Sequence, residues 1–463
     1  MHKQQLRLTY IFFDILSALA VWTLFMFFRR ATIDHQLFGM YETPLPNFDF
    51  QTSLLIFPFF CLFTYSLSGI YLQPQKHRQL KIFASTLIAT AIISIVIFFA
   101  LVAGDIRLSA YYHKAFLVLW GMLFFITYFF RVIICRIIRK NHKTGKWTTR
   151  TAIIGTGENA QKIAAEIAQK MPENTLIGFI AEDRYAKKTN IIGKLPQVDN
   201  IIKNENIQEI IIALDDNDEN RLFLLINSLY SHDITIRFTP SIYDILIGGV
   251  KMNELGISPL VTVTNSSMSD WETCVKRFFD ITVSFFSLLI LSPLFAFIAI
   301  RIKMDSDGAI FFRQERIGQF GKPFNILKFR TMYDNAENGK PQLSAADDKR
   351  VTPFGRFLRM YRLDELPQFW NVLKGEMSIV GPRPERQFYI KKIMEVAPYY
   401  CLIYKIRPGL TSWGPIRIGY SDTIEKMVER LNYDIIYIEN MSLKTDLKIL
   451  LFTFEVILKG KGV

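Results

Sequence analysis

The sequence predicts a membrane protein with three parts: a four-helix transmembrane bundle, a Rossmann-like α/β domain, and an α/β domain carried on a re-entrant membrane helix. Three observations predict this fold class. Four long apolar runs come first, a strand–glycine–helix pattern follows, and a proline-interrupted apolar run precedes an arginine-rich C-terminal part. The expected ranges are 1–140, 148–264 and 271–463, with the re-entrant helix over 278–303.

Composition supports membrane insertion and an anionic partner. Half of the 463 residues are hydrophobic, 40 of them Phe, and the net charge is 55 − 42 = +13. No nucleic-acid recognition motif accompanies this charge, so we expect no nucleic-acid partner, and anionic lipids and anionic substrates explain it better. The cysteines form no CxxC pair, the six histidines have no zinc-ligand spacing, and free thiols are expected at Cys61, Cys135, Cys274 and Cys401.

The four N-terminal apolar runs are 8–28, 54–72, 82–103 and 115–135. Each is close to the roughly 20 residues that cross a bilayer. Lysine and arginine concentrate before the first run, between the second and third, and after the fourth. The positive-inside rule therefore places the N-terminus and everything after the fourth run in the cytoplasm. No small-residue cleavage site follows the first run, which we expect to remain as a span.

The residues 151–169 read as a strand, a glycine turn and a helix. Gly155 and Gly157 occupy the first two places of the dinucleotide fingerprint, and an alanine stands at the third. Glu182 or Asp183 is only loosely placed to bind a ribose. A single GxGxxA is a weak signal, so a nucleotide site and a purely structural or regulatory role both stay open.

The apolar run before the C-terminal part is twenty residues long and has basic residues at both ends. At its middle, Ser292 and Pro293 predict a kink, because proline removes a backbone hydrogen bond. Because basic residues flank both ends, charge gives no preference for placing the two ends on opposite sides of the membrane. We therefore predict a re-entrant helix. Asp280 is expected to pair with Lys276 or Arg277 at the headgroup level.

After this helix, alternating residues predict a hairpin with strands 309–314 and 323–329. Lys328 and Arg330 lie at its end, where they could bind a diphosphate or lipid headgroups. A final apolar stretch, 447–458, is too short to span a bilayer, and lysines lie in and beside it. This stretch predicts an interfacial amphipathic helix.

Two short helices are predicted around an acidic pair. Thr352 before Pro353 marks the start of the first. The second is expected to begin at Pro367 and to end at Gly375. The adjacent carboxylates of Asp364 and Glu365 would lie at the break between them, near the amide-rich start of the second helix. Arginines surround this pair, at Arg356, Arg359, Arg362 and Arg383.

A carboxylate can attack phosphorus only where the negative charge of the phosphate is offset. Arginines and a divalent cation supply that offset, and a carboxylate nucleophile passes through an acyl-phosphate intermediate. The arrangement of Asp364, Glu365 and the arginines is compatible with this chemistry. The alternative is a surface cluster of ion pairs, which is the commonest fate of mixed charged stretches.

Four blocks in order resemble the bacterial sugar transferase family, the monotopic phosphoglycosyl transferases. The blocks are KRFFD (276–280), FFRQERIGQFGKPFNILKFRTM (311–332), RLDELPQFWNVLKGEMSIVGPRPE (362–385) and RPGLTSW (407–413). The resemblance implies that Asp364 is the nucleophile with Glu365 beside it. It also implies that Arg359 and Arg383 contact substrate phosphates.

The same resemblance implies the reaction and the location. Such enzymes of the bacterial inner membrane move a sugar 1-phosphate from a UDP-sugar to polyprenyl (undecaprenyl) phosphate, releasing UMP, through a phosphosugar-aspartate intermediate. Mg²⁺ is the expected cofactor, with Asp364 and Glu365 as its ligands or with Glu365 as a base. The product would start a capsule, an exopolysaccharide or an O-antigen. The segment 412–420 departs from the commoner family pattern, which leaves the sugar open, and a homo-oligomer also stays open.

Two other functions are compatible with parts of this sequence. A membrane-anchored nucleotide-sugar dehydratase or epimerase would also combine membrane helices with a Rossmann domain. It needs a Tyr-x-x-x-Lys pair for acid–base chemistry, and the sequence has none. A non-catalytic scaffold or sensor is the second alternative, and the intact acidic pair with its arginines disfavours it.

Overall fold

The computed structural model describes residues 2–34, 50–72, 74, 79–102, 109–144, 147–171, 174–181, 190–216, 218–230, 232, 234–240, 260–263, 267–333, 348–419 and 423–458. The chain divides into two compact units. Unit 1 comprises Met1–Lys146 and Ser269–Val275, and unit 2 comprises Trp147–Met268 and Lys276–Val463. The Rossmann-like part and the C-terminal part therefore share one unit. Glu182 and Asp183 lie outside the described residues.

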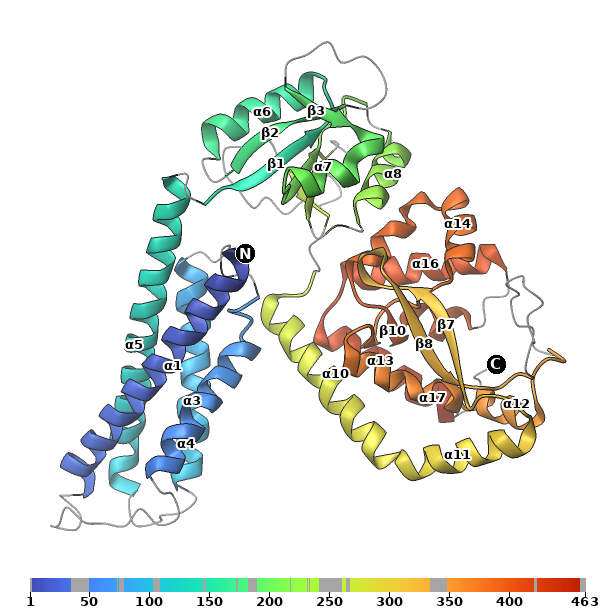
Figure 1. The fold of residues 1–463 in the computed structure, drawn as a ribbon. Coiled ribbons are helices and arrows are strands. Elements are labelled where there is room, and N and C mark those ends of the chain that lie inside the picture. Colours follow the sequence, from blue (N-terminus) through green and yellow to red (C-terminus); the bar gives the residue numbers. More distant parts are fainter. Residues whose placement is uncertain are drawn as a thin grey trace. The chain divides into compact units, whose positions relative to one another are not determined.

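Unit 1 is built from long helices that pack against one another (Figure 1). They are α1 (His2–Phe28), continued by the π-helical turn η1 (Arg29–Asp34), α3 (Phe50–Leu67), α4 (Gln79–Val102) and α5 (Ser109–Lys143). Among the described helices, three are long and apolar enough to cross a membrane, within α1, α4 and α5. The apolar part of α3, Thr52–Leu67, is shorter.

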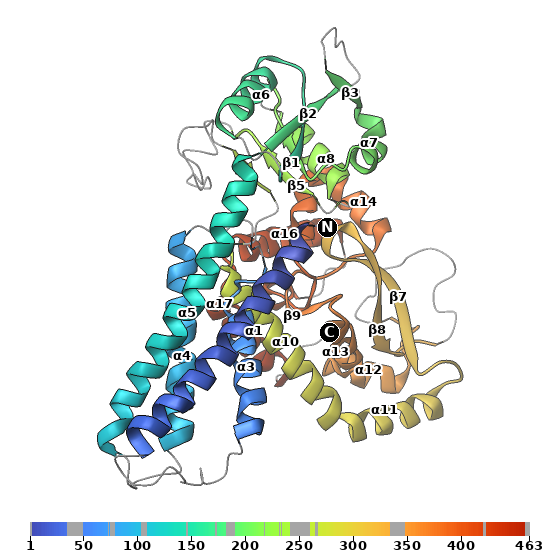
Figure 2. The same ribbon diagram turned by 60° about the vertical axis from the view of Figure 1, so that its left-hand side comes forward.

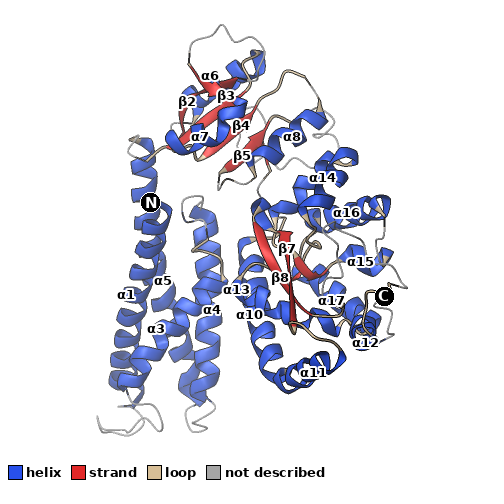
Figure 3. Ribbon diagram, turned by 45° about the vertical axis from the view of Figure 1, so that its right-hand side comes forward, coloured by secondary structure: helices blue, strands red, loops and turns tan. Residues whose placement is uncertain are grey.

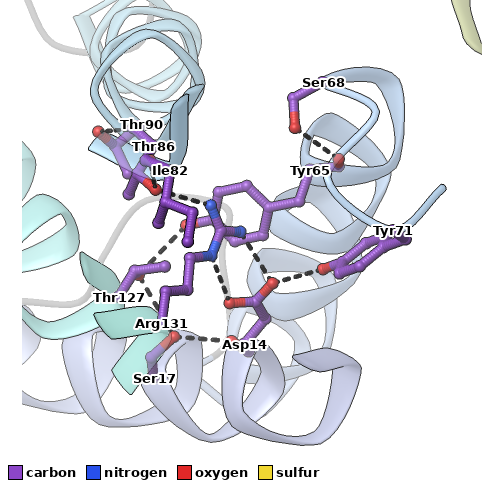
Figure 4. A network of polar contacts seen from close by, with 10 residues as sticks. All are labelled: Asp14, Ser17, Tyr65, Ser68, Tyr71, Ile82, Thr86, Thr90, Thr127 and Arg131. Atoms are coloured by element: carbon purple, nitrogen blue, oxygen red, sulfur yellow. Dashed lines mark hydrogen bonds and ion pairs between the residues drawn. The ribbon is translucent and has the colours of Figure 1, made fainter. Parts of the chain in front are cut away.

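A buried ion pair joins the helices of unit 1 (Figure 4). The Arg131 guanidinium on α5 donates to both carboxylate oxygens of Asp14 on α1, at 3.0 and 2.8 Å. It also donates to Thr86 Oγ1 on α4 at 2.9 Å and lies 4.3 Å from the centroid of the Tyr65 ring on α3. The Tyr71 hydroxyl donates to Asp14 at 2.6 Å. A charge inside an apolar bundle persists only when it is paired and hydrogen-bonded in this way.

The first part of unit 2 is a six-stranded sheet with order β3-β2-β1-β4-β5-β6, parallel except for the β5–β6 pair. This order is that of a doubly wound Rossmann sheet. Figure 3 shows its strands in red with helices beside them. The elements are β1 (Thr149–Ile154), α6 (Glu158–Lys170), β2 (Asn174–Ala181), β3 (Ile191–Lys194), η4 (Leu195–Gln197), α7 (Val198–Asn204), β4 (Glu209–Ile212), α8 (Glu219–Leu229), β5 (Thr235–Phe238) and β6 (Val261–Thr262).

Two apolar helices then meet at a bend, α10 (Asp270–Ile290) and α11 (Ser292–Asp305) (Figure 2). The break is at Leu291, next to Ser292 and Pro293, and the helices are inclined by 60°. Pro293 lies in the first turn of α11, where its missing N–H costs no hydrogen bond. A bend of this size fits a broken span as well as a re-entrant loop.

Three charged residues of α10 contact the C-terminal part of unit 2, namely Lys276, Arg277 and Asp280. Asp280 accepts hydrogen bonds from Ser378 Oγ at 2.7 Å and from the Ile379 amide at 3.0 Å. Lys276 instead forms an ion pair with Asp446 at 2.5 Å, and Arg277 donates to the carbonyls at the end of a short helix. The direct contacts of Asp280 are therefore hydroxyl and backbone donors rather than the predicted Lys276 or Arg277, although the charges of both basic residues still act on this carboxylate.

The C-terminal part surrounds two small sheets, an antiparallel β7–β8 hairpin and a parallel β9–β10 pair. Apolar residues remain exposed along the last helix, as expected of an amphipathic helix. The elements are β7 (Phe311–Ile317), η5 (Gln319–Gly321), β8 (Pro323–Phe329), α12 (Pro353–Met360), η6 (Leu363–Gln368), α13 (Phe369–Lys374), β9 (Ser378–Val380), α14 (Gln387–Val396), η7 (Pro398–Lys405), β10 (Gly409–Thr411), α15 (Trp413–Ile418), α16 (Ile424–Glu439) and α17 (Leu443–Leu458).

Candidate active site

The helix before the acidic pair begins as its sequence predicts. Thr352 Oγ1 accepts a hydrogen bond from the Gly355 amide at 3.0 Å, and Pro353 occupies the first turn. Gly355 is needed for packing, because a Cβ there would lie 2.2 Å from the Thr331 carbonyl oxygen. The cap and this close approach fix α12 against the chain that leaves β8.

The acidic pair lies in a 3₁₀ turn rather than at the start of an α-helix. α12 ends at Met360, and Arg362 adopts a left-handed conformation with φ 55°. A non-glycine residue with positive φ is uncommon, and such strain concentrates at functional sites. Asp364 and Glu365 then occupy the first turn of η6. The predicted second helix begins after this turn, as α13, and ends at the left-handed Gly375.

Cations from two other elements converge on Glu365. Lys328 on β8 donates to Glu365 Oε1 at 2.7 Å, and Arg383, which follows β9, has its guanidinium 3.5 Å from the same oxygen. Burial alone would raise the pKa of Glu365, but the positive charges of Lys328, Arg383 and Arg362 outweigh it. They hold the pKa of this carboxyl well below its usual range, so Glu365 is a fixed anion.

Asp364 is in a different electrostatic position. Its side chain is buried, and burial raises the pKa of this carboxyl to about 6. The positive charge of Lys328 opposes this rise, the neighbouring Glu365 adds to it, and Arg359 and Arg383 oppose it. Asp364 is consequently ionised at neutral pH, yet it is far more basic than Glu365. Two adjacent carboxyls with pKa values pushed apart are typical of groups with different chemical roles.

Arg359 and Arg330 differ in where their guanidinium groups are held. Arg359 Nε donates to Thr331 Oγ1 at 2.9 Å, and its charge acts on Asp364. Arg330 donates instead to the Ser306 and Asp307 carbonyls, at 2.5 and 2.6 Å, and to Ser306 Oγ at 3.0 Å. These bonds hold the end of α11. Of the two basic residues expected at the hairpin end, the structure brings Lys328 to the acidic pair and Arg330 to α11.

Four further charged residues lie behind Arg383 and were not singled out in the sequence. They are Arg316, Glu385, Arg430 and Asp434. Glu385 ends the GPRPE run, which was the only local sign of them. Arg430 and Asp434 lie four residues apart on α16, a spacing that puts both on one helix face. Nothing in the sequence pairs α16 with that run.

The glycine turn of the Rossmann-like part is filled by the protein itself. Gly155 has φ +119°, and a Cβ there would lie 2.3 Å from the Ala213 carbonyl oxygen. A Cβ at Gly157 would collide with the Asp215 carboxylate, which accepts a hydrogen bond from the Asn159 amide at 3.0 Å. Asp215 thus lies at the N-terminus of α6, where a Rossmann fold binds a pyrophosphate. Internal packing accounts for both glycines.

The acidic pair also suits one mode of magnesium binding. Among the described residues, no group of three or more His, Cys, Asp or Glu side chains could hold a metal ion. Mg²⁺ commonly needs only one or two carboxylates when substrate phosphates supply further oxygens. Asp364 and Glu365 offer such a pair.

Comparison with known proteins gives two matches along the chain. Residues 271–460 match the bacterial sugar transferase family, and residues 66–240 match a family described as a CoA-binding domain. The first match contains the acidic pair and the cations around it.

Curated relatives give the same picture. The chain is 35% identical over 263 residues to UDP-glucose:undecaprenyl-phosphate glucose-1-phosphate transferase of Klebsiella pneumoniae, covering 56% of this chain and 57% of that protein. It is 35% identical over 229 residues to UDP-N-acetylgalactosamine-undecaprenyl-phosphate N-acetylgalactosaminephosphotransferase of Aeromonas hydrophila, covering 50% and 53%. An uncharacterized sugar transferase of Haemophilus influenzae is 30% identical over 374 residues, covering 74% of this chain and 75% of its own. The chain therefore spans little more than half the length of the first two relatives.

Proposed function

Because the chain belongs to the bacterial sugar transferase family, we propose that it transfers a sugar 1-phosphate from a UDP-sugar to undecaprenyl phosphate or a similar polyprenyl phosphate. The products are polyprenyl-diphosphate-sugar and UMP. The names of the relatives, which act on UDP-glucose or UDP-N-acetylgalactosamine and undecaprenyl phosphate, support this reaction class. The lipid-linked sugar would begin a surface polysaccharide such as a capsule, an exopolysaccharide or an O-antigen.

Asp364 is the proposed nucleophile. A carboxylate oxygen of Asp364 attacks the β-phosphorus of the donor, and the bond from that phosphorus to the bridging oxygen breaks, so that UMP leaves with the electron pair. The sugar phosphate is then bound to Asp364 as an acyl phosphate. A phosphate oxygen of the polyprenyl phosphate attacks the same phosphorus and releases the Asp364 carboxylate. The raised pKa of Asp364 makes it the more basic, and so the more nucleophilic, of the two carboxylates.

Glu365 and the cations organise the charge around this step. A carboxyl whose pKa is held far below neutrality is a poor proton acceptor, so Glu365 serves better as an anchor for Lys328 and Arg383 than as a base. With Arg359, these cations would neutralise the donor diphosphate. Mg²⁺ held by Asp364, Glu365 and the diphosphate would supply further neutralisation.

The membrane arrangement is part of the proposal. The helices α1, α3, α4 and α5 of unit 1 would form a transmembrane bundle, and α10–α11 would enter and leave the cytoplasmic leaflet of the bacterial inner membrane. Exposed apolar side chains on both arms support a lipid contact, among them Leu289, Ile290, Phe297 and Ile300. Basic residues at both ends of the bent pair support a return to the same side.

The observation that carries the proposal is the buried Asp364 beside the Lys328–Glu365–Arg383 cluster. The test is UMP release by the detergent-solubilised protein with Mg²⁺, undecaprenyl phosphate and a panel of UDP-sugars. We expect UMP with at least one donor, and none from Asp364→Asn with an unchanged melting temperature or a higher one. Full turnover by Asp364→Asn would refute the assignment.

A cysteine at Ser306, probed with a membrane-impermeant maleimide, tests the re-entrant arrangement. Labelling from the periplasmic side would eliminate it, because Ser306 ends α11.

A further inference from the structure

One face of α10 is a polar stripe that points into the protein. Asp280 and Ser284 are the buried residues of this helix, 2% and 0% exposed. Lys276 precedes Asp280 by four residues, a spacing that places all three on one helix face. Large apolar side chains are exposed on the rest of the helix, among them Phe285, Phe286, Leu289 and Ile290. A helix surrounded by lipid keeps its polar residues on the side that faces protein, so the polar stripe attaches α10 to the C-terminal part.

The polar stripe binds every residue of the short strand β9, Ser378–Val380. The Asp280 carboxylate accepts from Ser378 Oγ at 2.7 Å and from the Ile379 amide at 3.0 Å. Lys276 Nζ donates to the Val380 carbonyl at 2.9 Å. A buried carboxylate and a nearly buried ammonium are costly to leave without partners, so these bonds fix β9 against α10.

A second helix with exposed apolar residues meets β9 at the same point. Asp446, in the first turn of α17, forms the ion pair with Lys276 at 2.5 Å. Its other carboxylate oxygen accepts from the Tyr437 hydroxyl on α16 at 2.7 Å. The helix expected to lie on the membrane surface is therefore joined to α10 at the end of β9.

Arg277 attaches the other half of the site to the same turn of α10. Its guanidinium donates to the Val372 and Leu373 carbonyls, at 2.8 and 3.1 Å, near the end of α13. The 3₁₀ turn η6, which contains the acidic pair, leads directly into α13. One turn of α10 therefore contacts both segments from which the site is built.

The strand β9 leads directly to Arg383. The two residues between them, Gly381 and Pro382, form backbone hydrogen bonds with β10 of 3.0 and 2.9 Å. The Arg383 guanidinium then lies 3.5 Å from Glu365 Oε1. Because only two held residues separate Val380 from Arg383, a displacement of β9 would move this arginine as well.

We propose that Lys276 and Asp280 are positioning residues through which the bent helix α10 fixes β9 and so places the Arg383 guanidinium beside Glu365. What Arg383 does there rests on the proposed function, whereas the bonds between α10 and β9 do not. A misplacement of about 1 Å at a phosphate-binding group can reduce a rate roughly a hundredfold. The helix that carries the exposed apolar surface thus sets the geometry of the site, although its polar stripe does not touch the acidic pair.

The first arm of the test is hydrogen exchange of single amides in the detergent-solubilised protein, and it does not depend on activity. In Asp280→Ala, the Ile379 amide loses its carboxylate partner and should exchange roughly ten times faster or more. The Gly381 amide should also exchange faster, although its own partner on β10 is unchanged. If Asp280→Ala does not fold, Asp280→Asn replaces it and should show smaller increases at both amides. Unchanged exchange at Gly381 in the variant that folds would overturn the proposal, because the bond to α10 would then act only locally.

The second arm is a double-mutant cycle on UMP release. Asp280→Ala should lower kcat/KM roughly 10- to 100-fold in the wild-type background and hardly at all in Arg383→Ala, because it acts through Arg383. Equal losses in both backgrounds would contradict the proposal. If Arg383→Ala alone leaves UMP release unchanged, the proposed role of Arg383 fails, and the exchange arm still decides whether α10 holds the segment.

Ser284→Ala is the matched control for both arms. Ser284 is buried on the same polar stripe, one turn after Asp280, but its hydroxyl has no hydrogen-bond partner among the described residues. Its removal should therefore change neither the exchange of Gly381 nor the rate of UMP release.

Discussion

The acidic pair predicts the pH dependence of the first chemical step. Asp364 must be ionised to attack phosphorus, and its pKa is about 6. The rate should therefore rise with pH through this value and level off above it. At pH 5 only about 9% of Asp364 would be ionised, so the rate should be roughly a tenth of its plateau.

Removing a neighbouring charge should shift the rising, acidic limb of this pH–rate profile, and the sign of the charge fixes the direction of the shift. Lys328 lowers the pKa of Asp364, so Lys328→Met should shift the limb to higher pH. A unit charge within about 12 Å contributes roughly 1.4 kcal/mol or more at an effective dielectric constant near 20, which corresponds to about one pH unit. Glu365 raises the pKa of Asp364, so Glu365→Gln should shift the limb to lower pH, whatever rate remains.

The assay is single-turnover UMP release without polyprenyl phosphate, so that ionisation of the acceptor does not enter. Arg356→Met is the matched control, because this arginine of α12 is exposed and is not among the charges that shift Asp364. Its limb should stay near pH 6. Shifts of Lys328→Met and Glu365→Gln in the same direction, or no acidic limb above pH 5, would refute the electrostatic account.

Other predictions concern stability and the Rossmann-like part. Burial in the folded protein raises the pKa of Asp364 from its ordinary 3.8 to about 6, so its contribution to stability is full below pH 4 and is lost as pH rises through 6. Asp364→Asn should therefore be the more heat-stable form at pH 8, by up to about 3 kcal/mol, with little difference at pH 4. Because Asp215 fills the anion site, millimolar CoA, NAD⁺ or UDP should leave hydrogen exchange of the wild-type turn 156–161 unchanged, and protection there would contradict that account. In unit 1, Arg131→Met should cost roughly 3–5 kcal/mol, and adding Asp14→Leu should restore much of it; equal melting temperatures for the single and double variants would show that the pair is not coupled.

Local signals in the sequence predicted local structure well. The cap at Thr352, the left-handed Gly375 and the β7–β8 hairpin depend on a few neighbouring residues, and the structure has all three. The strand–glycine–helix pattern of residues 151–169 is also present in the structure, as β1 and α6. These features are fixed by backbone sterics and short-range hydrogen bonds, which a single sequence displays.

Partners from distant parts of the chain could not be predicted. The acceptor role of Asp280 depends on Ser378, and Glu385 is paired with Arg430, because packing rather than spacing decides which elements meet. The partners of Lys328 and Arg330 could not be predicted either. Lys328 contacts the acidic pair, whereas the Arg330 guanidinium binds the end of α11. For the same reason, the sequence did not predict that the Asp215 side chain occupies the space beside Gly157.

The central claim is that Asp364 becomes covalently linked to the sugar phosphate. Its most direct test is rapid quenching of the enzyme with labelled UDP-sugar in the absence of polyprenyl phosphate, followed by mass spectrometry of the peptide that contains Asp364. We predict a mass increase of one phosphosugar on that peptide, lost on addition of polyprenyl phosphate and never formed by Asp364→Asn. The claim would be contradicted if product formed at the full rate while no adduct was detected at any time during a single turnover.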